Sequence, residues 1–321
     1  MNSPPLQAAG QPTLANLFSS LDRRARIGLI IIGALFLYFY LFYPAFPTTR
    51  GKTLAGWTWY GCNNVNGFLH GRFIPIVFGA LVFMAYQQVK DFEISSSKWG
   101  LVGIVLGILF YLAAVRTIQP RLATIGAPFV IVGMIYYLFG YRIGKHFIFA
   151  AFFLWFAIPV PGLETLMTAK LQYFITEVCY QGGLLIGMDL VRVGNDITVV
   201  GSGADPVKIA EGCSGMRSLM ALTMIAAVYS YFTQKPLWKK AVLFASALPL
   251  AIGGNFFRIF TILVITKMGY ADFAKRTYHD WAGLLIFFPI ALSGLYFFDY
   301  LLNRKQRQKK VLIRQTTKKT A

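Results

Sequence analysis

The chain has 321 residues, of which 56% are hydrophobic and only 13% charged, and its formal net charge is +19. This composition excludes an ordinary soluble domain and indicates a protein that crosses the membrane several times. The positive charge could suggest a nucleic-acid partner, but the basic residues gather at the ends of apolar runs and in the tail from Arg304 to Lys319. That distribution is typical of membrane topology and of contact with anionic lipid headgroups, so no nucleic-acid partner is expected.

Eight apolar runs predict an all-α polytopic protein with about eight transmembrane helices, since a span needs roughly 20 residues. A polar tail, residues 1–26, precedes the membrane domain, residues 27–302, and a basic tail, residues 303–321, follows it. The fifth run is the shortest and stops at a Pro-Val-Pro-Gly sequence. The predicted spans are Ile27–Phe46, Phe73–Val89, Trp99–Val115, Leu122–Tyr141, Phe147–Ile158, Cys213–Phe232, Leu237–Ile265 and Gly283–Leu302.

Two segments between the fifth and sixth runs are not expected to span. Residues 163–187 mix apolar and charged side chains, which predicts an amphipathic helix lying in the membrane interface. Residues 190–193 and 196–200 alternate in polarity around Gly194-Asn195, which predicts a small β-hairpin inserted before the sixth span.

Both termini are predicted to lie in the cytoplasm, because this orientation of a plasma (inner) membrane protein puts most lysines and arginines inside. In this orientation the hairpin, the end of the seventh span and the segment before the eighth all lie on the extracytoplasmic side. Residues from three distant parts of the sequence are therefore expected at one membrane face. The basic residues assigned to the cytoplasm are Arg23, Arg24, Arg26, Lys90, Lys98, Arg142, Lys145, Lys235, Lys239, Lys240 and those of the C-terminal tail.

The chain has three cysteines, at positions 62, 179 and 213, with neither a CxxC pair nor the spacing of metal ligands. No disulfide framework, metal site or cofactor is therefore predicted. Cys213 stands out because it begins the sixth run, where unpaired backbone N–H groups and the helix dipole favour a thiolate. Taken alone, Cys213 could equally be a small buried apolar residue, with Ser214 capping the helix.

Arg258 and His279 are the candidate partners of this cysteine. An arginine within an apolar run costs about 2.5 kcal/mol or more at mid-membrane, so it usually faces a cavity or a partner, although snorkelling to the interface is the alternative. Asn255 lies three residues earlier on the same helix face, which favours a polar cavity. His279 precedes the eighth run and is the one histidine of the three with a predicted route to Cys213.

Cysteine, histidine and arginine together would form an acyl-transfer site. Cys213 would attack a peptide carbonyl to give a thioester, His279 would carry the proton, and Arg258 would hold the developing oxyanion or the substrate carbonyl. Glu211 and Arg217 would either orient one another or the substrate, or form an ordinary ion pair at the edge of the loop.

Three motifs resemble the exosortase/archaeosortase family: Glu-Gly-Cys-Ser-Gly-Met-Arg-Ser at residues 211–218, Gly-Asn-Phe-Phe-Arg-Ile at residues 254–259, and His279 just before the last run. The resemblance covers roughly residues 147–302 and keeps the family's motif order. It implies a multispanning cysteine transpeptidase or thiol protease with Cys213 as the nucleophile and with Arg258 and His279 at the other two positions. Histidine at the third position resembles the bacterial exosortase branch.

The resemblance also implies the partners. Such enzymes recognise exported proteins with a C-terminal sorting signal, which consists of a short motif such as Pro-Glu-Pro, a membrane helix and a basic cluster. They are thought to cut at the motif and to pass the protein to an acceptor, often linked to extracellular polysaccharide or to lipid. A substrate held in the bilayer by its own helix would present its scissile bond at the membrane face where the three motifs meet.

Three other functions remain open on the sequence. A transporter would use the proline and glycines of the seventh run, Pro249 and Gly253-Gly254, to bend a gating helix, although no internal repeat is present. A lipid-processing or polysaccharide-assembly enzyme would use Arg217 and Arg258 to bind phosphate. A purely structural membrane protein would tolerate replacement of Cys213, Arg258 or His279.

Overall fold

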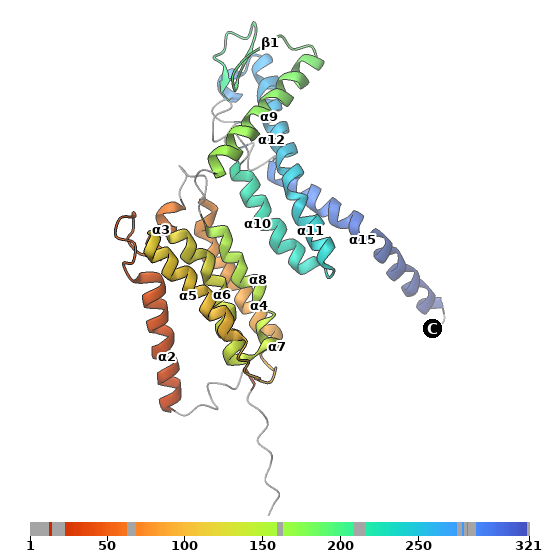
Figure 1. Ribbon diagram of the computed structural model, residues 1–321. Coiled ribbons are helices and arrows are strands. Elements are labelled where there is room, and N and C mark those ends of the chain that lie inside the picture. The colour runs from red at the N-terminus through yellow and green to blue at the C-terminus, as the bar shows by residue number, and fades with distance from the viewer. Residues whose placement is uncertain are drawn as a thin grey trace, which may run out of the picture. The chain divides into compact units, whose positions relative to one another are not determined.

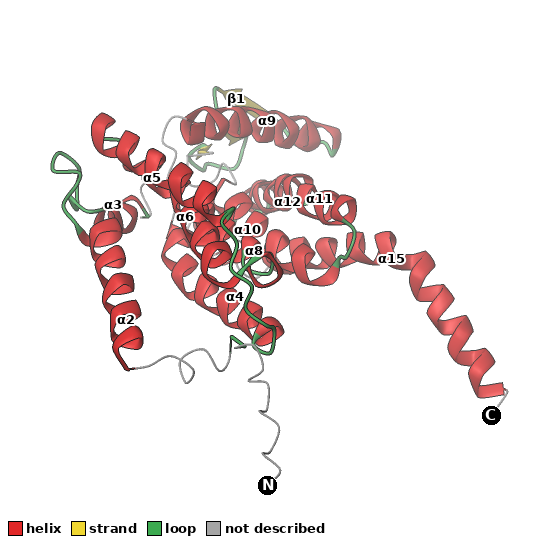
Figure 2. Ribbon diagram, turned by 60° about the horizontal axis from the view of Figure 1, so that its bottom comes forward, coloured by secondary structure: helices red, strands yellow, loops and turns green. Residues whose placement is uncertain are grey.

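The structure is a computed structural model that describes residues 13–14, 23–62, 69–158, 163–208, 216–274, 278, 281 and 287–319. The chain divides into two compact units, Met1–Pro159 and Val160–Ala321 (Figure 1). Helices make up most of both units, and one small sheet belongs to the second (Figure 2). The mainly helical fold class is therefore confirmed.

Within the described residues, four helical stretches are long and apolar enough to cross a membrane. They are His70–Val89, Gly100–Thr117, Pro120–Phe139 and Leu237–Lys267. Shorter apolar helices cover Arg26–Phe42, Ile148–Ala157 and Ser218–Thr233. Helices thus occupy every predicted apolar run, and the chain is a membrane protein, but a total of eight spans stays a prediction.

The first unit is a bundle of helices. It contains α2 (Arg23–Leu37), η1 (Tyr38–Phe42), α3 (Leu54–Gly61), η2 (Leu69–Phe73), α4 (Ile74–Val89), α5 (Gly100–Thr117), α6 (Pro120–Phe139), α7 (Tyr141–Gly144), α8 (Ile148–Phe153) and η3 (Leu154–Ala157). Helix α2 begins inside the segment predicted as the N-terminal tail. Within that same segment Thr13 pairs with Glu93 in an isolated β-bridge.

Helices α5 and α6 form the tightest pair of this unit, because glycines line their contact. A Cβ atom on Gly107 would lie 2.8 Å from the carbonyl oxygen of Gly126, and one on Gly133 would lie 2.6 Å from the amide nitrogen of Ile104. Small residues let two membrane helices approach until their backbones touch. The resulting van der Waals packing stabilises the pair in lipid, where there is no hydrophobic driving force between helices.

The second unit combines helices with the sheet. Its elements are α9 (Leu163–Leu185), β1 (Leu190–Val193), β2 (Asp196–Val199), β3 (Val207–Lys208), α10 (Met216–Thr233), α11 (Leu237–Ala245), α12 (Ala247–Lys267), α13 (Ala271–Phe273) and α15 (Phe288–Lys319). The predicted hairpin is confirmed: β1 and β2 pair antiparallel from Leu190 opposite Val199 to Val193 opposite Asp196. A third strand, β3, extends it, with Val207 opposite Ile197.

The sheet packs against α9 and α12 through one apolar face. Leu190, Ile197 and Val207 are buried together with Cys179 of α9 and Ile259 of α12. Alternation along the strands turns the remaining side chains outward, as Val191 and Val193 show by their exposure. The sheet is therefore fixed to the same two helices that carry most of the polar residues described below.

The predicted seventh span is broken into two helices. α11 ends at Ala245 and α12 begins at Ala247, with Ser246 between them. Pro249 explains the position of the break, because its ring lacks an N–H and clashes with the carbonyl of the residue four positions earlier, which is Ala245. The proline and glycines that a transporter would use to bend this span thus lie beside an interruption at Ser246 within the helical stretch Leu237–Lys267.

A polar network ties α10, α11 and α15 together at one end of the unit. The buried carboxylate of Asp299 accepts hydrogen bonds from Gln234, from Asn303 at 2.8 Å and from the Tyr229 hydroxyl at 3.3 Å. Lys239 Nζ in turn donates to Asn303 Oδ1 at 2.8 Å. Helix α15 then continues to Lys319, so the basic segment predicted as a tail is helical.

Candidate active site

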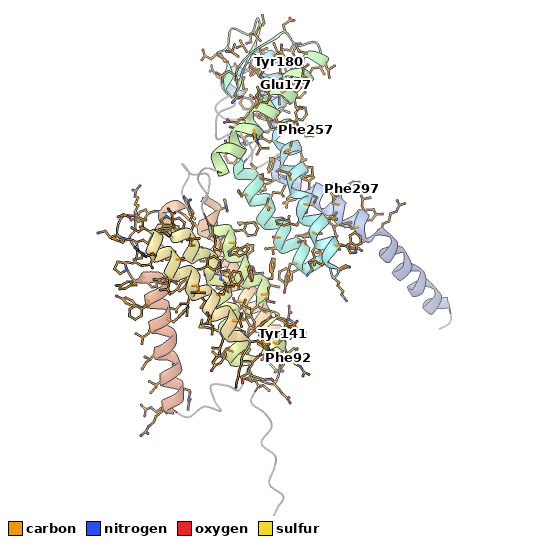
Figure 3. All side chains as sticks on the ribbon, viewed as in Figure 1. Phe92, Tyr141, Glu177, Tyr180, Phe257 and Phe297 are labelled. Atoms are coloured by element: carbon orange, nitrogen blue, oxygen red, sulfur yellow. The ribbon has the colours of Figure 1, made fainter. Side chains whose placement is uncertain are left out.

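Helix α12 carries Asn255 and Arg258 on its buried face. They are 1% and 8% exposed, whereas Phe257, labelled in Figure 3, is 50% exposed on the other face. Residues three apart in a helix lie on one face, so the amide and the guanidinium both point into the second unit. A buried guanidinium interacts strongly with any negative charge beside it, because the surroundings screen that charge less than water does.

A hydrogen-bonded chain connects Arg258 to the residue before His279. The Tyr278 hydroxyl and Thr261 Oγ1 lie 2.8 Å apart. Thr261 Oγ1 donates to the carbonyl oxygen of Arg258 at 2.9 Å and to that of Phe257 at 2.8 Å, so the Tyr278 hydroxyl is the donor to Thr261. Tyr278 is therefore held less than one turn of α12 from Arg258.

Phe287, which follows His279 in the sequence, contacts the same helix, α12. A Cβ atom on Gly254 would lie 2.5 Å from Cδ2 of Phe287, so this glycine lets the Phe287 ring rest directly on the backbone of α12. Phe287 itself is fully buried. Tyr278 before His279 and Phe287 after it thus contact α12 at Thr261 and Gly254, one on either side of Arg258.

The described residues on either side of Cys213 also pack around α12. Before it, Val207 of β3 is buried with Ile259. After it, Leu219 of α10 is buried with Ala251. The chain thus leaves the sheet and enters α10 at points that are both anchored to the helix carrying Asn255 and Arg258.

Several predicted site residues lie outside the described residues. They are Glu211, Cys213, Ser214 and His279. The backbone of Arg217 falls in the first turn of α10, but its side chain is outside the description. The structure therefore brings together Asn255 and Arg258, and the roles assigned to the other residues stay predictions.

The two described cysteines are poor nucleophiles. Cys62 and Cys179 are fully buried, and their thiols donate to the carbonyl oxygens of Ala157 and Phe256 at 3.8 and 3.9 Å. Burial raises the pKa of Cys62 to about 11, although Arg72 nearby lowers it, and burial raises the pKa of Cys179 to about 12. Because the thiolate is the reactive form, neither thiol is suited to attack a substrate at neutral pH.

The sheet is joined to α9 by a charged pair that the sequence reasoning did not identify. Arg192 of β1 forms a salt bridge with Glu177 and also donates from Nε to the carbonyl oxygen of Gly194 at 2.9 Å. Its guanidinium lies over the Tyr173 ring, 4.8 Å from the centroid. Tyr173 and Glu177 lie four residues apart and so share one face of α9, which is the only sequence signal for this contact.

Helix α9 also has an unexpected distribution of polar residues. Thr168, Gln172 and Thr176 are buried, whereas Tyr173 and Phe174 are exposed. An interfacial helix was expected to turn its polar side chains to water, but this stripe of residues spaced by four faces the interior of the unit. The helix is therefore confirmed and its position in the membrane interface stays a prediction, while Gln172 is, among the described residues, the one polar residue used for that prediction that is buried.

Among the described residues, no group of three or more histidine, cysteine, aspartate or glutamate side chains could hold a metal ion. The chemistry available at α12 is therefore that of a guanidinium, an amide and hydroxyl groups. These groups can orient a carbonyl and stabilise negative charge on its oxygen.

A protein-family model described as transmembrane exosortase matches residues 62–297. The match includes all seven predicted site residues and begins well before residue 147, where the sequence resemblance was placed. No curated protein and no solved structure matches the chain.

Proposed function

This chain belongs to the transmembrane exosortase family, and from that membership we propose that it is a membrane cysteine transpeptidase. Its substrates are exported proteins anchored by a C-terminal sorting signal, which consists of a short motif of the Pro-Glu-Pro kind, a membrane helix and a basic cluster. The observation that carries the proposal is the buried Arg258 on α12, within a family match that also contains Cys213 and His279.

The reaction has two steps. The Cys213 thiolate attacks the carbonyl carbon at the motif, and the C–N bond then breaks, which leaves a thioester on the enzyme. The departing amine, carrying the substrate's helix and basic cluster, takes a proton from His279. An acceptor nucleophile next gives its proton to His279 and attacks the thioester, the C–S bond breaks, and the protein joined to the acceptor is released with the Cys213 thiolate restored.

Arg258 stabilises the oxyanion that forms in both steps. A guanidinium presents planar, fixed donors to an oxygen, and its burial strengthens the interaction. Asn255, on the same face, supplies a further amide donor for the substrate carbonyl. Glu211, Ser214 and Arg217 support the loop or the substrate beside the nucleophile. The active site lies on the extracytoplasmic face of the inner membrane, and the acceptor is a lipid or a polysaccharide.

The test is the reactivity of Cys213 in cells. Cys213→Ala should abolish processing of a protein that carries a sorting signal, whereas Cys62→Ala and Cys179→Ala should retain it, because these two thiols are buried. A membrane-impermeant maleimide added from outside should label the native chain and the two control variants, but not Cys213→Ala.

Two results would count against the proposal. Processing that survives in Cys213→Ala would favour a phosphate-handling membrane enzyme or a transporter. Labelling of Cys213 only after the cells are opened would put the thiol on the cytoplasmic side, and the proposed orientation would then be wrong.

A further inference from the structure

The first unit contains an apolar cavity that takes no part in the proposed reaction. Its volume is about 440 Å³, which lies within the range of roughly 300 to 1,000 Å³ typical of ligand pockets. Hydrocarbon groups from η1, α3, α4, α6 and η3 form most of its wall, including Leu41, Leu54, Phe78, Ala127 and Leu154. A wall of this kind accepts a hydrocarbon chain rather than a polar ligand.

One arginine stands among these apolar residues. Arg72 of η2 lines the cavity, donates from Nε to the carbonyl oxygen of Cys62 at 2.8 Å and lies 4.9 Å over the centroid of the Trp59 ring. These contacts fix the plane of the guanidinium. The side chain remains exposed, and no described residue accepts a hydrogen bond from its two terminal nitrogens. Arg72 is thus held in place with two donor groups still available.

A second arginine adds to the charge at this end of the unit. Arg121 lies one turn before the cavity residue Thr124 on α6. Its Nε is buried and has no hydrogen-bond partner among the described residues. Arg116, in the last turn of α5, precedes it by five residues.

Among the described residues of the first unit, no acidic residue balances these charges. From Arg23 to Lys90, and again from Ile94 to Gly162, the sequence contains no aspartate or glutamate. The acids between these stretches follow the far end of α4 from Arg72. The predicted topology puts the arginines outside, so retention of positive charge in the cytoplasm does not explain them. Arg72 in the wall of an apolar cavity, with Arg121 one helical turn from the lining residue Thr124, favours a ligand that joins an anionic group to a hydrocarbon chain.

We propose that this cavity binds an anionic membrane phospholipid. One acyl chain fills the space between α4 and α6, and the phosphate accepts hydrogen bonds from the terminal nitrogens of Arg72, with Arg121 contributing charge. Arginine suits this role because its planar donors match the phosphate oxygens. Basic pockets between membrane helices bind lipid headgroups on the cytoplasmic side of membranes, and the same chemistry would serve here on the outer side.

The experiment measures lipid retained by the full-length chain. The protein is purified in detergent, mixed with vesicles of either phosphatidylglycerol or phosphatidylcholine with identical acyl chains, washed, and analysed by native mass spectrometry. Phosphatidylglycerol should be retained roughly tenfold better, because the choline cation of phosphatidylcholine offsets the charge of its phosphate and is repelled by the arginines. Millimolar inorganic phosphate should not displace it, because phosphate alone does not fill the cavity.

Variants distinguish binding of the lipid headgroup from binding of the acyl chain. Arg72→Gln should lower retention of phosphatidylglycerol roughly tenfold, and Ala127→Phe should lower retention of both lipids by filling the cavity. Arg142→Gln removes one exposed charge from α7 of the same unit and should change nothing. If Arg72→Gln fails to fold, Ala127→Phe, which keeps every arginine, carries the test.

Equal retention of the two lipids, displacement by inorganic phosphate, or unchanged retention in Ala127→Phe would each overturn the proposal. None of these measurements uses peptide processing. They therefore test the lipid site apart from the transpeptidase chemistry, and Cys213→Ala should retain the lipid like the native chain.

Discussion

The Tyr278 hydroxyl contacts Thr261, and Thr261 contacts the backbone of Arg258. Because Tyr278 adjoins His279 in the sequence, this chain of hydrogen bonds fixes one end of the His279 segment to the helix that carries Arg258. Tyr278 is thus a positioning residue rather than a catalytic one. Its ring packs against the apolar cluster of α9, α12 and the sheet, so removal of the hydroxyl alone should leave the fold intact.

We expect Tyr278→Phe to lower the rate of substrate processing about fivefold, because one neutral hydrogen bond contributes about 1 kcal/mol. Thr261→Val should have the same effect, and the double variant should be no worse than either single one. Tyr270→Phe, at an exposed position, is the matched control. Maleimide labelling of Cys213 should not change in any of these variants. Additive losses in the double variant would mean that the two side chains act independently.

For single residues, the sequence predicted which side chains are buried better than it predicted what they contact. Arg258 within an apolar run had to face either a partner or the interface, and the physical cost of lipid exposure favoured the first. Asn255 followed from helical spacing alone. The role of Thr261 could not be predicted, because a threonine in an apolar helix usually bonds only to its own preceding turn, as Thr266 does with Ile262.

Among the helices, α10, α11 and α15 share an apolar cluster and also a polar network centred on one buried carboxylate. Asp299 accepts hydrogen bonds from Tyr229 and Gln234 of the α10 end and from Asn303 of its own helix. In a membrane, few other groups could satisfy these donors if the carboxylate were removed. The network therefore holds the helix after Cys213 against the helix after His279.

We expect Asp299→Ala to destabilise the protein, since each buried group left unsatisfied costs about 1 to 3 kcal/mol. The midpoint of thermal unfolding in detergent should fall in this variant and stay unchanged in Asp272→Ala, whose carboxylate is exposed on α13. Equal midpoints for the two variants would show that the network contributes nothing to stability.

The elements differ in how far local sequence determined them. Gly194-Asn195 between alternating residues was sufficient to predict the β1–β2 hairpin, because turn chemistry and register are local. Pro249 predicted a disturbance of the seventh run and marks the break between α11 and α12. The buried polar residues of α9, Thr168, Gln172 and Thr176, could not be predicted, because α9 packs against α10 and α12, which lie far from it in the sequence.

For the molecule as a whole, hydropathy predicted where the helices lie but did not determine how many of them cross the membrane. The fifth run forms only α8 and η3, which together cover Ile148–Ala157. A helix of this length falls short of the roughly 20 residues that cross a bilayer. Orientation is therefore the global property that most needs measurement, since both the placement of Cys213 and the meaning of the outer arginines depend on it.

Helix α5 gives the cleanest measurement of orientation, because it is one of the four stretches long enough to span. A reporter enzyme active only outside the cytoplasm should be inactive when fused after Ser95, beside the basic residues Lys90 and Lys98, and active when fused after Ile118. A fluorescent protein that matures only in the cytoplasm should give the opposite pattern and controls for expression. The reverse result would put the α5–α6 connection, with Arg116 and Arg121 beside it, on the cytoplasmic side. The tendency of basic residues to stay in the cytoplasm would then explain those arginines without a bound lipid.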